Sequence, residues 1–167
     1  TYKAGSNKCL GVSGGSQQLL LCCACAVEGS DCMPGWLVKA DPDDYGAQDL
    51  EAEGSAVWDG VSNPQALGFI RQMNRGDKVF VYHSGAEKSV VALAKVKDAP
   101  APDPADPNGK RYVVGLTFVD WLERPVTLAE IKADPAFAEF LLVRNSRLSV
   151  MPVNDAEWKR VHKLAGT

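Results

Sequence analysis

Apolar residues between positions 33 and 167 occur in short runs, whose spacing alternates between that of a strand and that of a helix. The runs rich in β-branched or aromatic residues predict strands over 36–39, 55–58, 78–84, 89–96, 111–118 and 148–150. A short turn joins the third run to the fourth, so we expect these two strands to pair as a hairpin.

Helix signals lie between these runs. Asn63 is a good N-cap residue and Pro64 suits the first helical position, ahead of apolar residues at helical spacing up to Met73. Further cap signals lie at Thr127, Asp134 and Asn154, and a brief helix-like segment covers 48–53. Short strands mixed with short helices favour the α+β class, as a small, mixed and partly closed β-barrel flanked by short helices.

The segment 99–108 holds four prolines and predicts an exposed loop. The chain on either side of it is too short to form two separate cores. We therefore expect one domain to span this loop and to cover residues 33–167.

The first 32 residues differ from the rest in composition. They are rich in Gly and Ser and hold all five cysteines of the chain, Cys9, Cys22, Cys23, Cys25 and Cys32. We interpret residues 1–32 as an irregular N-terminal extension, with Met33 as the expected natural start. A zinc site and a secretory signal are the weaker alternatives, because the cysteine spacing and the signal-like features fit those patterns poorly.

Composition narrows the class of protein. The 167 residues are 46% hydrophobic and 23% charged, with a formal net charge of −3, which fits a folded soluble domain. No apolar run is long enough to span a membrane. The acidic balance argues against bulk attraction of nucleic acid but leaves a local basic border open. Its candidates, which could equally be scattered surface charges, are Lys39, Arg71, Arg75, Lys78, Arg144 and Arg147.

Signals for catalysis are sparse. His83 and Ser84 are adjacent, and neighbours in a strand point to opposite faces, so they do not form a nucleophile and base pair. The acidic cluster Asp41–Asp44 is more typical of a solvated turn than of a metal site. Phosphate-cradling, dinucleotide-binding and nucleophile-elbow motifs are absent. We expect no cofactor, no metal and no enzymatic activity.

Several segments resemble the EVE domain, in the order in which that family has them. They are WLVKADPDDY (36–45), VWDGVSNPQA (57–66), GDKVFVYHSG (76–85), RPVTLAEIKADP (124–135) and RLSVMPV (147–153). The resemblance covers nearly all of residues 36–164 and none of residues 1–32.

The resemblance implies a PUA-like β-barrel, related to PUA and YTH domains, that binds a modified base such as methylated cytosine or adenine. Trp58, which by itself could be a core residue or a stacking ring, would form a wall of the pocket. Asp59, Lys39 and Asp41 would offer polar edges to the base.

Other site residues come from the same matched segments. By resemblance, the mouth of the pocket would include Asn63, Tyr82, His83, Ser84, Arg147 and Ser149. The chain departs from the family pattern at Ser62, Pro64 and Leu67, so a phosphate-binding Arg and a stacking Tyr are missing there.

The expected partner is DNA or RNA that carries a modified base, bound by a monomer with no membrane association. Two alternatives stay open. One is a hydrolase or nuclease that uses His83 with the Asp41–Asp44 cluster. The other is a module that binds a non-nucleic ligand or a protein. The cysteine-free domain favours a cytoplasmic location, or a nuclear one in a eukaryote.

Overall fold

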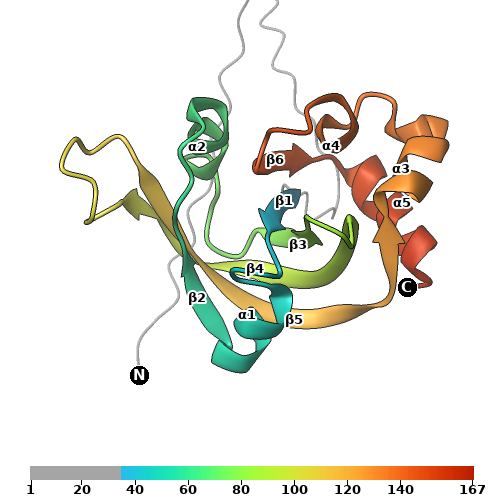
Figure 1. Cartoon of the computed structure of the whole chain (residues 1–167), viewed down its shortest axis with the longest axis horizontal. Coiled ribbons are helices and arrows are strands. Elements are labelled where there is room, and N and C mark those ends of the chain that lie inside the picture. Colours follow the sequence, from blue (N-terminus) through green and yellow to red (C-terminus); the bar gives the residue numbers. More distant parts are fainter. Residues whose placement is uncertain (1–34) are drawn as a thin grey trace, which may run out of the picture. The chain divides into compact units, whose positions relative to one another are not determined.

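The computed structural model describes residues 35–167, so the predicted extension over 1–32 lies outside the described residues. One mixed sheet has the strand order β2-β5-β4-β3-β1-β6 (Figure 1). Within it β1 and β3 run parallel, and the other neighbouring strands are antiparallel. The strands are β1 (Gly35–Ala40), β2 (Ser55–Trp58), β3 (Lys78–His83), β4 (Ser89–Pro102), β5 (Tyr112–Thr127) and β6 (Val150–Val153).

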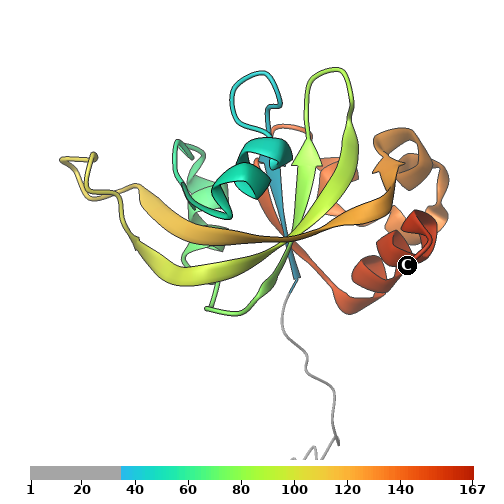
Figure 2. The same cartoon turned by 90° about the horizontal axis from the view of Figure 1, so that it is seen from below.

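Short helices connect the strands. They are α1 (Ala47–Glu53), α2 (Pro64–Ile70), α3 (Leu128–Ala133), the 3-10 helix η1 (Pro135–Phe137), α4 (Leu141–Arg144) and α5 (Asp155–Ala165). The predicted cap at Asn63 is confirmed, because its side chain accepts hydrogen bonds from the first turn of α2. Capping boxes at Thr127 and Asn154 likewise start α3 and α5. Figures 1 and 2 place α3 and α5 at one end of the sheet.

Strands β4 and β5 both extend beyond the predicted ranges 89–96 and 111–118, and the tip of the hairpin that they form projects at the end of the sheet opposite α5 (Figures 1 and 2). The prediction of a loop over 99–108 is wrong for its first four residues, which continue β4. Pairing between β3 and β4 stops at Lys95, so one side of β4 has no β3 partner beyond that residue. Prolines are tolerated on such an unpaired strand side, which explains Pro100 and Pro102.

The strand predicted over 148–150 is shifted, because β6 covers Val150–Val153 and includes Pro152. Within residues 35–167, β6 pairs on one side with β1, and β2 pairs on one side with β5. These two strands therefore end the hydrogen-bonded ladder. The mixed sheet with short helices is confirmed, and its closure into a barrel stays a prediction.

The core lies between the sheet and the helices packed on it. Phe80 of β3 stacks on Trp158 of α5, with 3.9 Å between the ring centroids. The buried carboxylate of Asp77 accepts a hydrogen bond from the indole Nε1 of Trp36 at 2.8 Å. Across residues 35–167, no helix combines the length and the apolar character that crossing a membrane requires.

The carboxylate of Glu130 stabilises the junction between β5 and α3, and its contribution can be tested. The Thr127 backbone N–H, then the Arg124 guanidinium and the Thr127 hydroxyl, lower the pKa of this carboxyl to about 2. Its pKa in the folded state is below that in the unfolded state. The stability that Glu130 contributes is therefore present above its ordinary pKa of 4.5 and is lost as the pH falls towards about 2.

We expect Glu130→Gln to lower the free energy of unfolding at neutral pH and to have a shrinking effect below about pH 4.5. Urea unfolding of both proteins across this pH range measures the difference. Glu139→Gln is the control, because the exposed Glu139–Arg144 ion pair should contribute little. A difference between wild type and Glu130→Gln that is constant with pH would contradict this account.

Candidate functional site

A pocket of about 930 Å³ lies where the ends of β1 and β2 meet the segment before β6. We call it the main pocket. Its volume is within the range of small-molecule sites. It brings together seven of the ten residues that the sequence predicted for base binding, namely Lys39, Asp41, Trp58, Asp59, Asn63, Arg147 and Ser149.

Trp58, the last residue of β2, forms an aromatic wall of the main pocket. Pairing of Trp58 with Val114 of β5 fixes its backbone, and the residue is 9% exposed. The ring meets Tyr45 edge-on, with centroids 6.2 Å apart. Trp58 is therefore a core residue that also presents part of its surface to the pocket. It combines the packing role that the sequence left open for it with a position on the pocket wall.

Tyr45 extends this wall and is a pocket residue that the sequence did not single out. Its hydroxyl donates a hydrogen bond to the Glu53 carboxylate at 2.9 Å. Burial, followed by the influence of Glu53, raises the pKa of Tyr45 to about 12. The phenol is therefore a neutral donor held in place across α1.

Lys39 enters the pocket from the end of β1. Its ammonium donates a hydrogen bond to the Ser146 carbonyl at 2.8 Å and lies 5.8 Å from the centre of the Tyr82 ring. Burial lowers the pKa of Lys39. The Lys39 backbone N–H also donates to the Ser149 carbonyl at 2.8 Å, which carries Arg147 and Ser149 to the pocket.

The rim of the main pocket is acidic. Asp41 shapes a turn, because its backbone carbonyl accepts from the N–H groups of Asp44 and Tyr45. Carboxylates outnumber cations around the cavity, with Asp41, Asp44, Glu53 and Asp59 set against Lys39 and Arg147. Such a lining favours a ligand that donates hydrogen bonds and repels a phosphate group.

Asn63 joins the rim to α2. Its side-chain oxygen accepts from the N–H groups of Gln65 at 2.9 Å and Ala66 at 3.2 Å, so this oxygen is committed to the helix cap. Only the amide nitrogen of Asn63 then remains as a donor for a ligand.

The three remaining predicted residues do not line the main pocket. Tyr82 and His83 are buried in the core, and the hydroxyl of Ser84 donates to the Ala40 carbonyl at 3.0 Å. They contribute indirectly, because their backbones run beside the end of β1 that carries Lys39.

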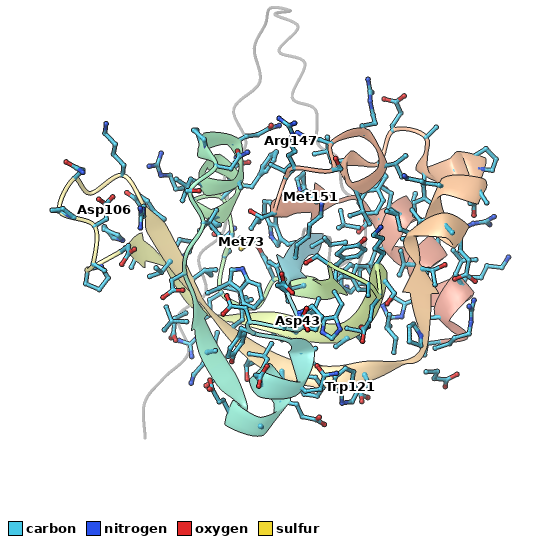
Figure 3. The ribbon with its side chains drawn as sticks, in the orientation of Figure 1. Asp43, Met73, Asp106, Trp121, Arg147 and Met151 are labelled. Carbon is cyan, nitrogen blue, oxygen red and sulfur yellow. The ribbon has the colours of Figure 1, made fainter. Side chains whose placement is uncertain are left out.

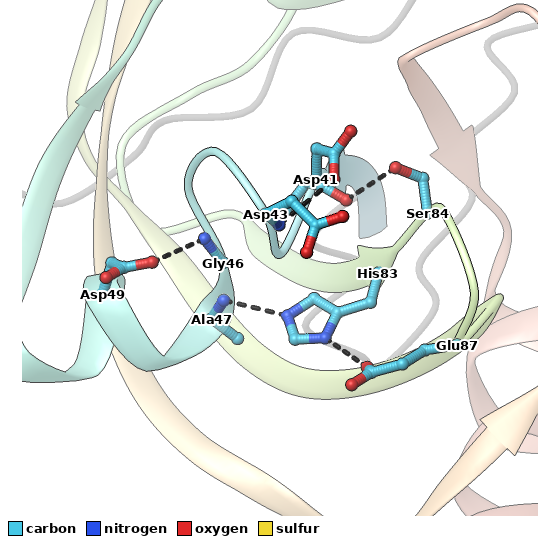
Figure 4. Close-up of polar contacts among 9 residues, drawn as sticks. Asp41, Asp43, Gly46, Ala47, Asp49, His83, Ser84 and Glu87 are labelled. Carbon is cyan, nitrogen blue, oxygen red and sulfur yellow. Dashed lines mark hydrogen bonds and ion pairs between the residues drawn. The ribbon is translucent and has the colours of Figure 1, made fainter.

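His83 has both ring nitrogens engaged (Figure 4). Its Nε2 accepts from the backbone N–H of Ala47 at 2.9 Å, and its Nδ1 lies 2.5 Å from the Glu87 carboxylate. An N–H group can only donate, so Nε2 carries no proton and Nδ1 donates to Glu87. A fully buried imidazole held in this way is a structural group and is not placed to act as a general base.

The acidic residues near His83 also lack the arrangement of a metal site. The described range 35–167 contains no group of three or more His, Cys, Asp or Glu side chains that could hold a metal ion. The geometry therefore gives the hydrolase alternative neither an exposed base nor a ligand cluster.

A cavity of this size with an aromatic wall and a few polar groups is typical of a ligand-binding or active site. Residues 35–164 match the family model of the EVE domain. The chain belongs to the EVE domain family, as its sequence motifs predicted.

Relatives of known structure share the fold. Protein Rpa0253 from Rhodopseudomonas palustris is 40% identical, with a TM-score of 0.76 over 80% of this chain and 93% of that chain. Human THYN1, solved in complex with 5-methylcytosine-containing DNA, is 27% identical, with a TM-score of 0.73 over 80% and 98%. In sequence, human thymocyte nuclear protein 1 is 29% identical, in an alignment that covers 77% of this chain and 72% of that protein.

The structural role of His83 can be tested directly. We expect His83→Ala to lower the free energy of unfolding by about 2–4 kcal/mol, because the buried Ala47 N–H loses its acceptor and a cavity forms. Ser84→Ala, which removes one partly exposed hydrogen bond, should cost about 1 kcal/mol or less. Chemical denaturation measures both. A His83→Ala protein of unchanged stability would contradict this role.

Proposed function

We propose that this protein binds DNA carrying a modified base and holds that base, turned out of the helix, in the main pocket of a PUA-like domain. The observation that carries the proposal is the convergence of predicted base-binding residues around one cavity with Trp58 as its wall. The human relative solved with 5-methylcytosine-containing DNA supports this class of ligand.

The chemistry of the cavity suits an aminopyrimidine or aminopurine. A flat base stacked on Trp58 gains roughly 1–3 kcal/mol, and a buried methyl group adds about 0.8 kcal/mol. The carboxylates of Asp41 and Asp59 accept hydrogen bonds from an exocyclic amino group. Lys39 and Arg147 donate to ring nitrogen or carbonyl acceptors of the base.

The proposed activity is recognition without turnover. Among the described residues that line the pocket, the serine hydroxyls of Ser55, Ser62 and Ser149 have no histidine beside them to activate them. We propose DNA as the partner ahead of RNA because of the human relative. The monomeric state and the cytoplasmic or nuclear location stay predictions.

Of the three departures from the family pattern, only Ser62 lines the main pocket. Pro64 begins α2 and Leu67 is a buried residue of that helix, and both line a second concave surface beside α2, as Ser62 also does. These substitutions leave the Trp58 wall in place. They bear on affinity more than on the presence of a site.

Fluorescence anisotropy tests the proposal with the full 167-residue chain. Matched duplexes would be unmodified or carry 5-methylcytosine, 5-hydroxymethylcytosine or N6-methyladenine, at two salt concentrations. We expect one modified duplex to bind more tightly than its unmodified match at both salt concentrations. Equal affinity for all duplexes would contradict base recognition, and tight, salt-insensitive binding of a non-nucleic ligand would favour the alternative module.

Trp58 is the most direct target for substitution. We expect Trp58→Ala to weaken binding of the modified duplex by about tenfold to hundredfold, because the stacking surface is lost. Trp58→Phe keeps a ring and should recover much of that affinity. The same anisotropy titration measures all variants, with melting curves run in parallel because Trp58 is also a core residue.

Trp121→Ala is the matched control, because Trp121 lies away from Arg147 and the main pocket (Figure 3). It should leave affinity for the modified duplex unchanged. If Trp58→Ala and Trp121→Ala bound with the same affinity as wild type, the assignment of Trp58 as the stacking wall would be wrong.

A further inference from the structure

A second concave surface, of about 460 Å³, lies between α2 and the loop at the tip of the β4–β5 hairpin. We call it the hairpin groove. Ser62 lines both this groove and the main pocket, so the two concavities meet at one residue. The cations Arg71, Lys110 and Arg111 line the groove.

The hairpin tip is held in a defined shape by Asp106 (Figure 3). Its carboxylate accepts from the backbone N–H groups of Arg111 at 2.8 Å, Lys110 at 2.7 Å and Asn108 at 3.0 Å. These bonds, the one from Arg111 first, lower the pKa of Asp106. The single carboxylate that lines the groove therefore stays ionised and shapes its own loop, and its one negative charge is set against three cations.

Arg71 links the two walls of the groove. From the end of α2, its Nη2 donates to the Lys110 carbonyl at 3.0 Å, and its guanidinium lies 4.4 Å from the centre of the Tyr112 ring. A guanidinium has five N–H donors, so this arrangement fixes the side chain and leaves donors for another acceptor.

The side chains of Lys110 and Arg111 are exposed at the hairpin tip. Among residues 35–167, the ion pairs involve His83, Arg124, Arg144 and Arg160, and none of the three groove cations. The groove is thus a cationic surface on an acidic protein.

The two concavities have opposite electrostatic character. The acidic rim of the main pocket repels phosphates, so a nucleic acid whose base enters it must carry its backbone along another surface. The hairpin groove adjoins the pocket at Ser62 and offers cations there. Such cations bind phosphate oxygens and fix the register of a strand, and they do not read sequence.

We propose that the hairpin groove binds the phosphates of the DNA strand that flanks the base in the main pocket. This inference rests on the proposed function. Affinity is then divided between two surfaces, with selectivity in the main pocket and salt-dependent affinity in the hairpin groove.

The test uses the full chain with the double substitution Lys110→Glu and Arg111→Glu. Both side chains are exposed, and the bonds to Asp106 come from their backbones, so the loop should keep its shape. Lys159→Glu with Lys163→Glu is the matched control, because it reverses two exposed charges on α5 at the other end of the sheet (Figure 1).

Anisotropy with a 5-methylcytosine duplex and its unmodified match, at several salt concentrations, gives affinity, selectivity and salt dependence. We expect the groove variant to bind both duplexes about tenfold more weakly, or weaker still, while the ratio of the two affinities stays unchanged. The slope of log affinity against log salt concentration should become smaller by about 2. The phosphate-free nucleoside 5-methyl-2′-deoxycytidine, followed by NMR, should bind wild type and variant equally.

The outcomes separate the two proposals. Duplex binding by the groove variant that equals that of the α5 control would overturn the groove assignment and leave base recognition standing. If the groove variant lost nucleoside binding as strongly as duplex binding, the groove assignment would also be overturned, because the substitutions would then act through the main pocket. A wild-type protein without preference for the modified duplex, and without nucleoside binding, would instead overturn the proposed function.

Discussion

The location of the main pocket depends on the hydrogen bond between the buried imidazole of His83 and the backbone N–H of Ala47. Parallel pairing sets Ala40 of β1 opposite His83 of β3, so the two strands end together. The chain then turns and enters α1 at Gly46, where an added Cβ atom would lie 2.9 Å from Gln48 Oε1 and 3.3 Å from the Pro42 Cα atom, with His83 Nε2 in ordinary contact at 3.4 Å. The close approach at Gly46 and the bond to Ala47 fix the turn that carries Asp41 and Tyr45.

This constraint explains how distant segments make one cavity. The end of β1 supplies Lys39, the end of β2 supplies Trp58, and the bond from Lys39 to Ser149 adds the segment before β6. On this chain of net charge −3, the negative and positive side chains are concentrated in two different concavities. Carboxylates gather where a base would donate hydrogen bonds, and cations gather beside them in the hairpin groove, where phosphates would lie. Overall acidity and binding of nucleic acid are therefore compatible.

Local signals in the sequence were enough to predict the helix caps and most strands, since Asn63, Thr127 and Asn154 act within a few residues of themselves. The length of β5 was hidden, because its second half contains exposed polar residues and Pro125. His83 was predicted in the pocket mouth because a polar residue in a matched motif resembles a site residue. Its partner Ala47, 36 positions away, is visible only in the fold. Arg71 was a candidate for a basic border, but the hairpin groove was not predicted, because Arg71 meets Lys110 across 39 positions.

The central claim is that Trp58 and the rim around it receive a modified base. The most direct measurement is an NMR titration of the isotope-labelled chain with 5-methyl-2′-deoxycytidine, which follows tryptophan indole and backbone amide signals. The account predicts concentration-dependent shifts at Trp58, Asp59 and Ser62, with the indole of Trp158, partly buried on α5, unchanged. Shifts confined to other parts of the domain would contradict the account. So would the absence of any shift with the nucleoside if the same chain binds the modified duplex.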